Sequence, residues 1–160
     1  INIAIAPTKM NDRIEWFIEK ATEIGINCIS TIICEKSERK TIKLDRLDKI
    51  VISAMKQSLQ YYKPYVKEIV TFNSFINDCK SDNKFIAHCK KVNKQHLSSY
   101  KLNSNSTTVL IGPEGGFTQK EIQKAEEKGF IAVTLGNNRL RTETAALVAT
   151  QILSEFNTEI

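Results

Sequence analysis

The fold of this chain is decided by residues 107–146, which read TTVLIGPEGGFTQKEIQKAEEKGFIAVTLGNNRLRTETAA. Two short apolar runs, at 109–111 and 131–135, each stop at a loop that carries glycine. Between them, Thr118 and Glu121 have the Thr-x-x-Glu spacing of a helix capping box, which predicts that a helix starts there. The stretch therefore predicts two strand–loop–helix units. In α/β sheets the loops that leave the carboxyl ends of strands bind ligands, so we expect a site here.

The remainder of the chain also alternates between strands and helices. Apolar runs predict strands at 3–6, 28–34, 66–70 and 85–89. Helical spacing predicts a helix up to residue 24, with Asp12 and Glu15 as its capping signal and Gly25 as its terminating glycine. Further helices are predicted at 47–62, at 72–79 and after a cap at Thr142, and the polar residues 103–106 predict a linker. This pattern predicts one α/β domain over residues 1–160, with a mostly parallel sheet covered by helices on both faces.

The composition is that of a single globular domain, with 41% hydrophobic and 26% charged residues among 160. No apolar run reaches membrane-spanning length and no signal peptide is visible, so we expect a cytoplasmic protein without membrane contact. The four cysteines have no metal-ligand spacing and only two histidines are present, so we expect buried, reduced thiols and no metal. The net charge of +5 is compatible with a polyanionic partner but does not require one.

The loop at 112–116 differs from the glycine motifs that bind nucleotide phosphates. A P-loop needs a lysine and a hydroxyl directly after its last glycine, whereas this loop contains Glu114 and the next lysine is Lys120. A dinucleotide fingerprint belongs to the first strand–helix turn, and this loop comes late in the chain. A phosphate ligand is therefore disfavoured by repulsion from Glu114, whereas a neutral or cationic adenosine ligand is not.

The chain also lacks the parts of nucleophilic catalysis. His88 and Cys89 are neighbours in a predicted strand, where successive side chains point to opposite faces, and no Gly-x-Ser-x-Gly elbow is present. The polar groups that remain are backbone amides together with Arg139, Arg141, Glu114 and Glu143. Such a site positions and polarises a substrate without forming a covalent intermediate.

Two motifs at this separation carry a specific resemblance. IGPEGGFTQKEI followed by LGNNRLRTETAA resembles the paired signature of the ribosomal RNA small subunit methyltransferase E family, which belongs to the SPOUT superfamily. Upstream, NDRIEWFIEKATEIGI is similar to the family's first helix and CEKSERKTIKLDRLDKI to its next segment, so the resemblance covers nearly the whole chain. Lys56 and Gln60 depart from the family's pattern, which weakens any role inferred at those two positions.

The resemblance implies an α/β fold whose carboxyl-terminal third forms a trefoil knot. It implies S-adenosylmethionine as cofactor, methylation of uridine N3 in 16S ribosomal RNA of the small ribosomal subunit, and a homodimer. Family members carry an amino-terminal RNA-binding domain, and this chain, which begins with Ile1, is expected to be the catalytic domain without it. The positions that correspond to the family's cofactor site are His88, Ile111, Gly112, Gly116, Leu135, Gly136, Leu140, Arg141 and Thr142.

The same resemblance suggests roles for charged residues. Arg141 could stabilise the uridine anion, held by Glu143 or Glu114, and Glu114 is also a candidate base. A structural salt bridge between Arg141 and Glu143 is the alternative. The apolar residues of the last helix could be buried in one subunit or lie at the dimer interface; they are Ala145, Leu147, Val148, Ile152 and Phe156. Expected contacts to the RNA backbone are Arg13, Lys36, Arg39, Lys40, Lys63 and Arg139.

Other interpretations of the sequence remain open. A nucleotide-dependent enzyme of ordinary doubly wound fold would contain the same strand–helix alternation, although the phosphate lysine and the fingerprint are missing. A knotted RNA-binding module without chemistry, or an RNA methyltransferase of the same superfamily with another target, would share the two motifs. Binding of S-adenosylmethionine and transfer of its methyl group to 30S subunits separate these possibilities.

Overall fold

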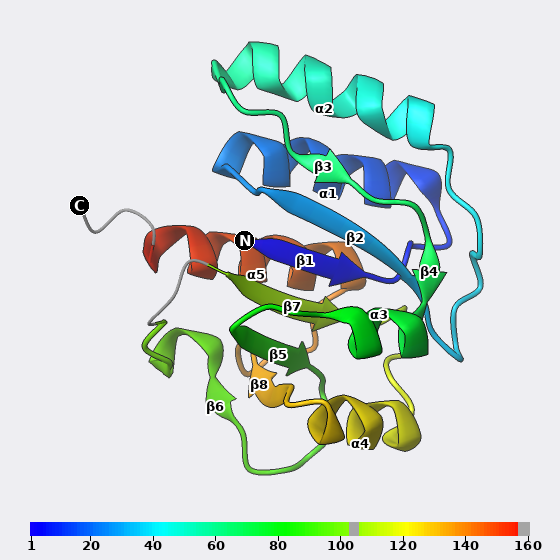
Figure 1. Ribbon diagram of the computed structural model, residues 1–160, viewed down its shortest axis with the longest axis vertical. Helices are drawn as coiled ribbons and strands as arrows, with labels where there is room; N and C mark the ends of the chain where they lie inside the picture. Colours follow the sequence, from blue (N-terminus) through cyan, green and yellow to red (C-terminus); the bar gives the residue numbers. More distant parts are fainter. Residues whose placement is uncertain (103–105, 157–160) are drawn as a thin grey trace.

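The computed structural model describes residues 1–102 and 106–156 (Figure 1). Its strands are β1 (Asn2–Ile5), β2 (Cys28–Ile33), β3 (Tyr65–Val66), β4 (Val70–Thr71), β5 (Asn83–Ala87), β6 (Gln95–His96), β7 (Thr107–Ile111) and β8 (Ile131–Thr134). They form one sheet in the order β3-β2-β1-β7-β5-β8-β6, and β4 also pairs with β2. All pairings between these described strands are parallel, which confirms the predicted mostly parallel sheet.

Helices connect the strands and cover both faces of the sheet. They are α1 (Asn11–Ile24), α2 (Leu44–Ser58), α3 (Phe72–Asp78), α4 (Gln119–Glu127) and α5 (Thr142–Phe156), with a 3-10 turn at Leu97–Ser99. Helices α1 and α5 pack against each other on one face, and α2 lies on the outer side of α1 (Figure 1). Helices α3 and α4 cover the opposite face.

The two core layers follow from the alternation of side chains along each strand. In β7, Val109 and Ile111 pack in the layer of α1 and α5, while Leu110 packs in the layer of α3 and α4. Phe85 and Ile86 of β5 divide between the two layers in the same way. Because both faces of these strands are buried, the strands are continuous apolar runs, as the sequence showed.

Helix ends test the capping signals. The Thr118–Glu121 capping box is confirmed, since each side chain accepts a hydrogen bond from the other residue's backbone N–H. Gly25 ends α1 in the left-handed conformation with φ of 101°, as predicted. The capping signal at Asp12 is wrong, because α1 begins at Asn11 after Met10 and Asp12 lies within the first turn. Thr142 is also not a cap, because it is the first residue of α5.

Some element boundaries differ from the sequence-based expectation. The strand predicted at 66–70 consists of two short strands, because β3 pairs with the start of β2 and β4 with its end. Helix α2 begins at Leu44 and ends at Ser58, and β5 ends at Ala87, so that His88 and Cys89 lie in a loop. The sequence did not predict β6 or the 3-10 turn. The linker predicted at 103–106 lies largely outside the described residues.

The burial of particular side chains also differs from expectation. All four cysteines are free thiols, but only Cys34 is buried and Cys89 is exposed, so the prediction of buried thiols is wrong for Cys89. The buried residues of α5 are Thr142, Glu143, Ala146, Ala149, Thr150 and Leu153. The apolar residues predicted to be buried in one subunit or to lie at a dimer interface are half-buried, and the choice between these two alternatives stays a prediction; they are Ala145, Leu147, Val148, Ile152 and Phe156. The trefoil knot stays a prediction. Among the helices described, none has the length and apolar character needed to cross a membrane.

Candidate functional site

Three adjacent strands end within one residue of the same row of the sheet. Ala87 at the end of β5 is the register partner of both Ile111 of β7 and Val133 of β8. The chain then leaves the sheet through the loops that start at His88, Gly112 and Leu135. The three loops singled out in the sequence therefore begin side by side at the carboxyl edge, which is where ligands bind in parallel sheets.

A hydrogen bond joins the two glycine-bearing motifs directly. The hydroxyl of Thr142 donates to the carbonyl oxygen of Gly112 over 3.0 Å. Thr142 is buried, and the N–H of Ala145 donates to the carbonyl oxygen of Arg141 to begin α5. The first turn of α5 is thus attached to the loop after β7, and residues 112–116 and 135–142 belong to one site.

Glycine is required in the loop after β7 by close approach and by backbone conformation. A Cβ atom on Gly112 would lie 3.1 Å from the ring of Phe117 and 3.2 Å from its backbone nitrogen. Gly116 has φ of 70°, and its N–H donates to the carbonyl oxygen of Pro113 over 2.7 Å. The loop therefore turns tightly, and the absence of a side chain at Gly112 lets Phe117 pack against it.

His88 is held as a neutral imidazole by Lys94. The ammonium of Lys94 donates to the carbonyl oxygens of His88 and Lys90, and its Nζ lies 3.1 Å from Nδ1 of His88. An ammonium can only donate, so Nδ1 accepts and the ring proton lies on Nε2, which is buried and has no partner among the described residues. Burial, followed by the charges of Lys94 and Lys90, lowers the pKa of His88 to about 4. His88 thus offers an N–H donor without a charge at neutral pH.

The acidic residues of the site are held by groups other than Arg141. Glu143 is only 9% exposed, and its Oε1 lies 3.8 Å from Nε of Arg13 on α1. Its Oε2 is buried without a partner in the part of the chain that the structure describes. Glu114 accepts a hydrogen bond from the backbone N–H of Lys9 over 2.8 Å. The expected pair between Arg141 and Glu143 is therefore corrected to a pair between Arg13 and Glu143.

Comparisons with known proteins agree with this architecture. Residues 1–154 match the model of the family described as the RNA methyltransferase domain. The chain belongs to this family.

Members of the RNA methyltransferase domain family resemble the chain over most of its length. It is 31% identical to the ribosomal RNA small subunit methyltransferase E of Rickettsia conorii, covering 93% of this chain and 62% of that protein. A probable rRNA-methyltransferase from Porphyromonas gingivalis has a crystal structure that superposes with a TM-score of 0.91 at 41% identity, covering 97% of this chain and 66% of that one. The Neisseria gonorrhoeae ribosomal RNA small subunit methyltransferase E, solved with S-adenosyl methionine, superposes at 0.87 with 34% identity, covering 96% and 65%. This chain spans less than two thirds of the length of these relatives.

The basic residues expected to contact RNA lie in two different situations. Lys40 and Arg139 are exposed and have no hydrogen-bond or ion-pair partner within residues 1–102 and 106–156. The other four each contact a group of this domain: Arg13 contacts Glu143, Lys36 the carbonyl oxygen of Gly115, Arg39 the carbonyl oxygens of Thr8 and Lys9, and Lys63 a carboxylate oxygen of Asp48. An RNA role for any of the six stays a prediction.

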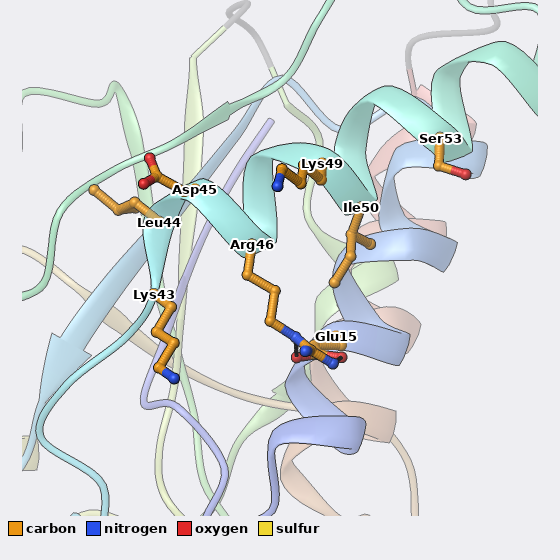
Figure 2. A pocket seen from close by; sticks show the side chains of 8 residues that line it. All are labelled: Glu15, Lys43, Leu44, Asp45, Arg46, Lys49, Ile50 and Ser53. Carbon is orange, nitrogen blue, oxygen red and sulfur yellow. Dashed lines mark hydrogen bonds and ion pairs between the residues drawn. The ribbon is translucent and has the colours of Figure 1, made fainter.

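A separate hollow of about 740 Å³ lies where α2 begins beside α1 (Figure 2). Its lining residues come from α1 and from residues 43–53, and none belongs to the three loops at the strand ends. Inside it, the guanidinium of Arg46 pairs with Glu15 and donates a hydrogen bond to its carboxylate. This hydrogen bond holds the pKa of Glu15 below its ordinary value. Because Arg46 and Glu15 neutralise each other in this hollow, the strand ends are the better candidate for the functional site.

Sequence reasoning missed two residues that shape the site. Lys94 fixes the tautomer of His88, and Lys9 presents its backbone N–H to Glu114. Lys94 lies in a lysine-rich loop whose path no periodic pattern predicts, and Lys9 acts through its backbone, which carries no residue-type signal. The proximity of His88 to Lys94 became visible only with the course of residues 88–94.

Proposed function

We propose that this chain is the catalytic domain of an S-adenosylmethionine-dependent methyltransferase that modifies uridine N3 in 16S ribosomal RNA. The observation that carries the proposal is the hydrogen bond from Thr142 to Gly112 at the shared ends of β7, β5 and β8, in a member of the RNA methyltransferase domain family. In this proposal the enzyme works as a cytoplasmic homodimer on the small ribosomal subunit.

The residues at the strand ends suit this cofactor. The short glycine loop at 112–116 presents backbone groups suited to holding a ligand, and the buried N–H of His88 supplies one donor without adding charge. The cofactor-binding set is His88, Ile111, Gly112, Gly116, Leu135, Gly136, Leu140, Arg141 and Thr142. When bound, S-adenosylmethionine supplies an electrophilic methyl group with a cationic sulfonium, and the carboxylate of Glu114 favours a cation in this region.

For the chemistry, the proton on uridine N3 must leave as the new nitrogen–carbon bond forms. Arg141 is exposed, and within the described residues its guanidinium has no partner, so it is free to stabilise negative charge on O2 or O4 of the uracil. Glu114 is the candidate base, since the N–H of Lys9 uses only Oε1 and the described residues give Oε2 no partner. Glu143, held by Arg13 and buried, orients the first turn of α5.

Partner surfaces follow from exposure. Leu147, Val148 and Ile152 leave part of the apolar face of α5 accessible, which supports packing against a second copy of the chain. Lys40 and Arg139 are exposed cations without a partner among the described residues, which suits them to phosphate groups of RNA. Both surfaces are proposed to bind partners and are not part of the cofactor site.

The test combines two measurements. Calorimetry with S-adenosylmethionine is expected to give one binding event per chain, and a methyl-transfer assay on 30S subunits lacking the modification is expected to label the 16S RNA at a uridine N3. Mass spectrometry of the digested RNA locates the methyl group. A chain that binds no S-adenosylmethionine contradicts the proposal, and a chain that binds it without transfer to RNA favours the non-catalytic alternative.

A further inference from the structure

The segment 34–39, which reads CEKSER and lies between β2 and α2, forms hydrogen bonds with the loop 112–116, with the residues that precede α1 and with Glu121 of α4. We propose that this clamp segment positions the loop 112–116 for the cofactor, and that Lys36 and Arg39 serve there as positioning residues and not as RNA contacts. The inference rests on the proposed function, because it assigns the loop 112–116 to cofactor binding.

The clamp segment has a defined shape of its own. The N–H of Cys34 donates to the hydroxyl of Ser37 over 2.9 Å, and the N–H of Ser37 donates back to the carbonyl oxygen of Cys34 over 3.1 Å. Both residues are buried, and Cys34 packs in the core layer that contains Phe117. The segment is therefore a rigid turn anchored in the core, able to transmit position to its neighbours.

Its first contact to the loop passes through the capping carboxylate of α4. Oε2 of Glu121 accepts from the N–H of Thr118 over 2.8 Å, and Oε1 accepts from the N–H of Glu35 over the same distance. The buried carboxylate of Glu121 thus joins the start of α4 to Glu35, which is 86 residues away from Glu121 in the sequence. A buried carboxylate is stable only when its oxygens are satisfied, so the position of α4 depends on the clamp segment.

The second contact lies directly on the glycine loop. Nζ of Lys36 donates to the carbonyl oxygen of Gly115 over 3.1 Å. The aliphatic stem of Lys36 crosses the glycine so closely that a Cβ there would lie 3.0 Å from Cδ of the lysine. Lys36 and Gly115 therefore fit each other, and a side chain at position 115 would displace the lysine.

The third contact connects the clamp segment to the glycine loop indirectly, through the residues that precede α1. Arg39 donates through Nε to the carbonyl oxygen of Thr8 over 2.9 Å and through Nη2 to that of Lys9 over 2.6 Å. The N–H of Lys9 in turn donates to Glu114 in the glycine loop. The fork of a guanidinium can hold two carbonyl oxygens in fixed positions, which a single ammonium cannot do. Arg39 thereby acts on Glu114 through the backbone of Lys9.

The experiment compares Arg39→Ala with Lys40→Ala, which removes the same charge one residue further along from a side chain without a described partner. Calorimetry measures the affinity for S-adenosylmethionine, and binding to a 16S ribosomal RNA transcript is measured across a salt series. Arg39→Ala is expected to weaken cofactor binding about tenfold through the lost charge-assisted hydrogen bonds, with the salt slope for RNA unchanged. Lys40→Ala is expected to show the reverse, with the salt slope reduced by about one unit. Arg39→Lys should recover part of the lost affinity.

A second measurement does not depend on the cofactor. Hydrogen exchange, followed by mass spectrometry, is expected to become faster across residues 112–116 in Arg39→Ala and not in Lys40→Ala. Unchanged exchange there, or wild-type cofactor affinity with a reduced salt slope in Arg39→Ala, would overturn the inference. If the unaltered chain binds no S-adenosylmethionine, the proposed function fails, while the exchange result still decides whether the clamp positions the loop.

Discussion

At the carboxyl end of the sheet, side chains connect loops that are far apart in the sequence, whereas at the amino end large side chains lie exposed. Glu114 and Lys9 are 105 residues apart, and Lys36 and Gly115 are 79 apart, yet each pair is joined by a hydrogen bond. At the other end, where α2 stops and β3 begins, Tyr61 is 93% and Tyr62 is 89% exposed.

This difference shows where the fold requires a fixed geometry. A binding site needs groups held in position before the ligand arrives, and hydrogen bonds between loops supply that constraint. Beside Tyr61 and Tyr62, Gln60 donates to the carbonyl oxygen of Glu23 and Lys63 pairs with Asp48. Among the described residues neither tyrosine side chain takes part in such a bond, so replacing either tyrosine should disturb little. Matched substitutions at the carboxyl and amino ends of the sheet should therefore differ in their effects on cofactor affinity and turnover.

The largest expected effect is on turnover. Replacing Arg141 by Ala removes the cation proposed to stabilise the uracil anion, so methyl transfer should fall on the order of 100-fold, a much larger loss than that of S-adenosylmethionine affinity, which the other residues of the cofactor-binding set retain. Lys56→Ala removes the same charge from the end of α2 and should leave turnover unchanged. Single-turnover assays with 30S subunits measure both variants. Retained turnover in Arg141→Ala would refute the catalytic role.

The next effect separates cofactor binding from stability. In Gly112→Ala the new Cβ meets Phe117 at 3.1 Å, so the loop must move and cofactor affinity should fall about tenfold. In Gly25→Ala, at the amino end, φ of 101° is strained for alanine, which should cost about 1 kcal/mol of unfolding free energy without changing cofactor affinity. Calorimetry and urea unfolding give the two quantities. Equal loss of cofactor affinity in both variants would contradict the claim that only the carboxyl end of the sheet shapes the cofactor site.

A smaller effect concerns the dependence of stability on pH at the carboxyl end. Burial and its lysine neighbours lower the pKa of folded His88 from 6.5 to about 4. Between these values the unfolded chain binds a proton that the folded chain does not, so this contribution to stability is present above pH 6.5 and is lost as the pH falls to about 4. For a half-exposed ring the loss should be about 1 kcal/mol after solvent screening. His88→Gln should lack it, and urea unfolding at a series of pH values compares the two; identical pH profiles would contradict the described environment of His88.

The smallest effect is expected at the amino end. Tyr61→Ser and Tyr62→Ser should each change the free energy of unfolding by less than about 0.5 kcal/mol, since both side chains are almost fully exposed. Tyr100→Ser is the matched contrast, because Tyr100 packs against Phe85 with ring centroids 5.0 Å apart and should cost more. Urea unfolding provides the values. A large loss in either exposed variant would mean that the amino end has a structural role of its own.

The order of strands and helices could be predicted because it depends on local patterns. The fully buried apolar run of β7, the capping box at Thr118 and the left-handed Gly25 each leave a signal within a few residues. The capping signal at Asp12 misled, because Oδ1 of Asp12 accepts from the adjacent N–H of Arg13 inside a helix that has already begun. Local signals compete, and the sequence alone does not say which prevails.

The partners of charged residues could not be predicted, because they depend on how distant elements cross. Arg141 and Glu143 are two residues apart, and residues at that spacing on a helix do not face each other. Glu143 instead faces α1, where Arg13 lies within 3.8 Å. Likewise, the sequence predicts RNA contacts for Lys36 and Arg39, and only the packing of distant loops reveals that both contact backbone carbonyl oxygens of this chain.

The most direct test maps S-adenosylmethionine onto the chain by NMR. The amide signals of residues 88, 111–116 and 135–142 should shift on addition of the cofactor, because the account assigns its site to the ends of β7, β5 and β8. The residues around the hollow at 43–53 should remain unchanged. Shifts concentrated at 43–53, with none at the strand ends, would contradict the account.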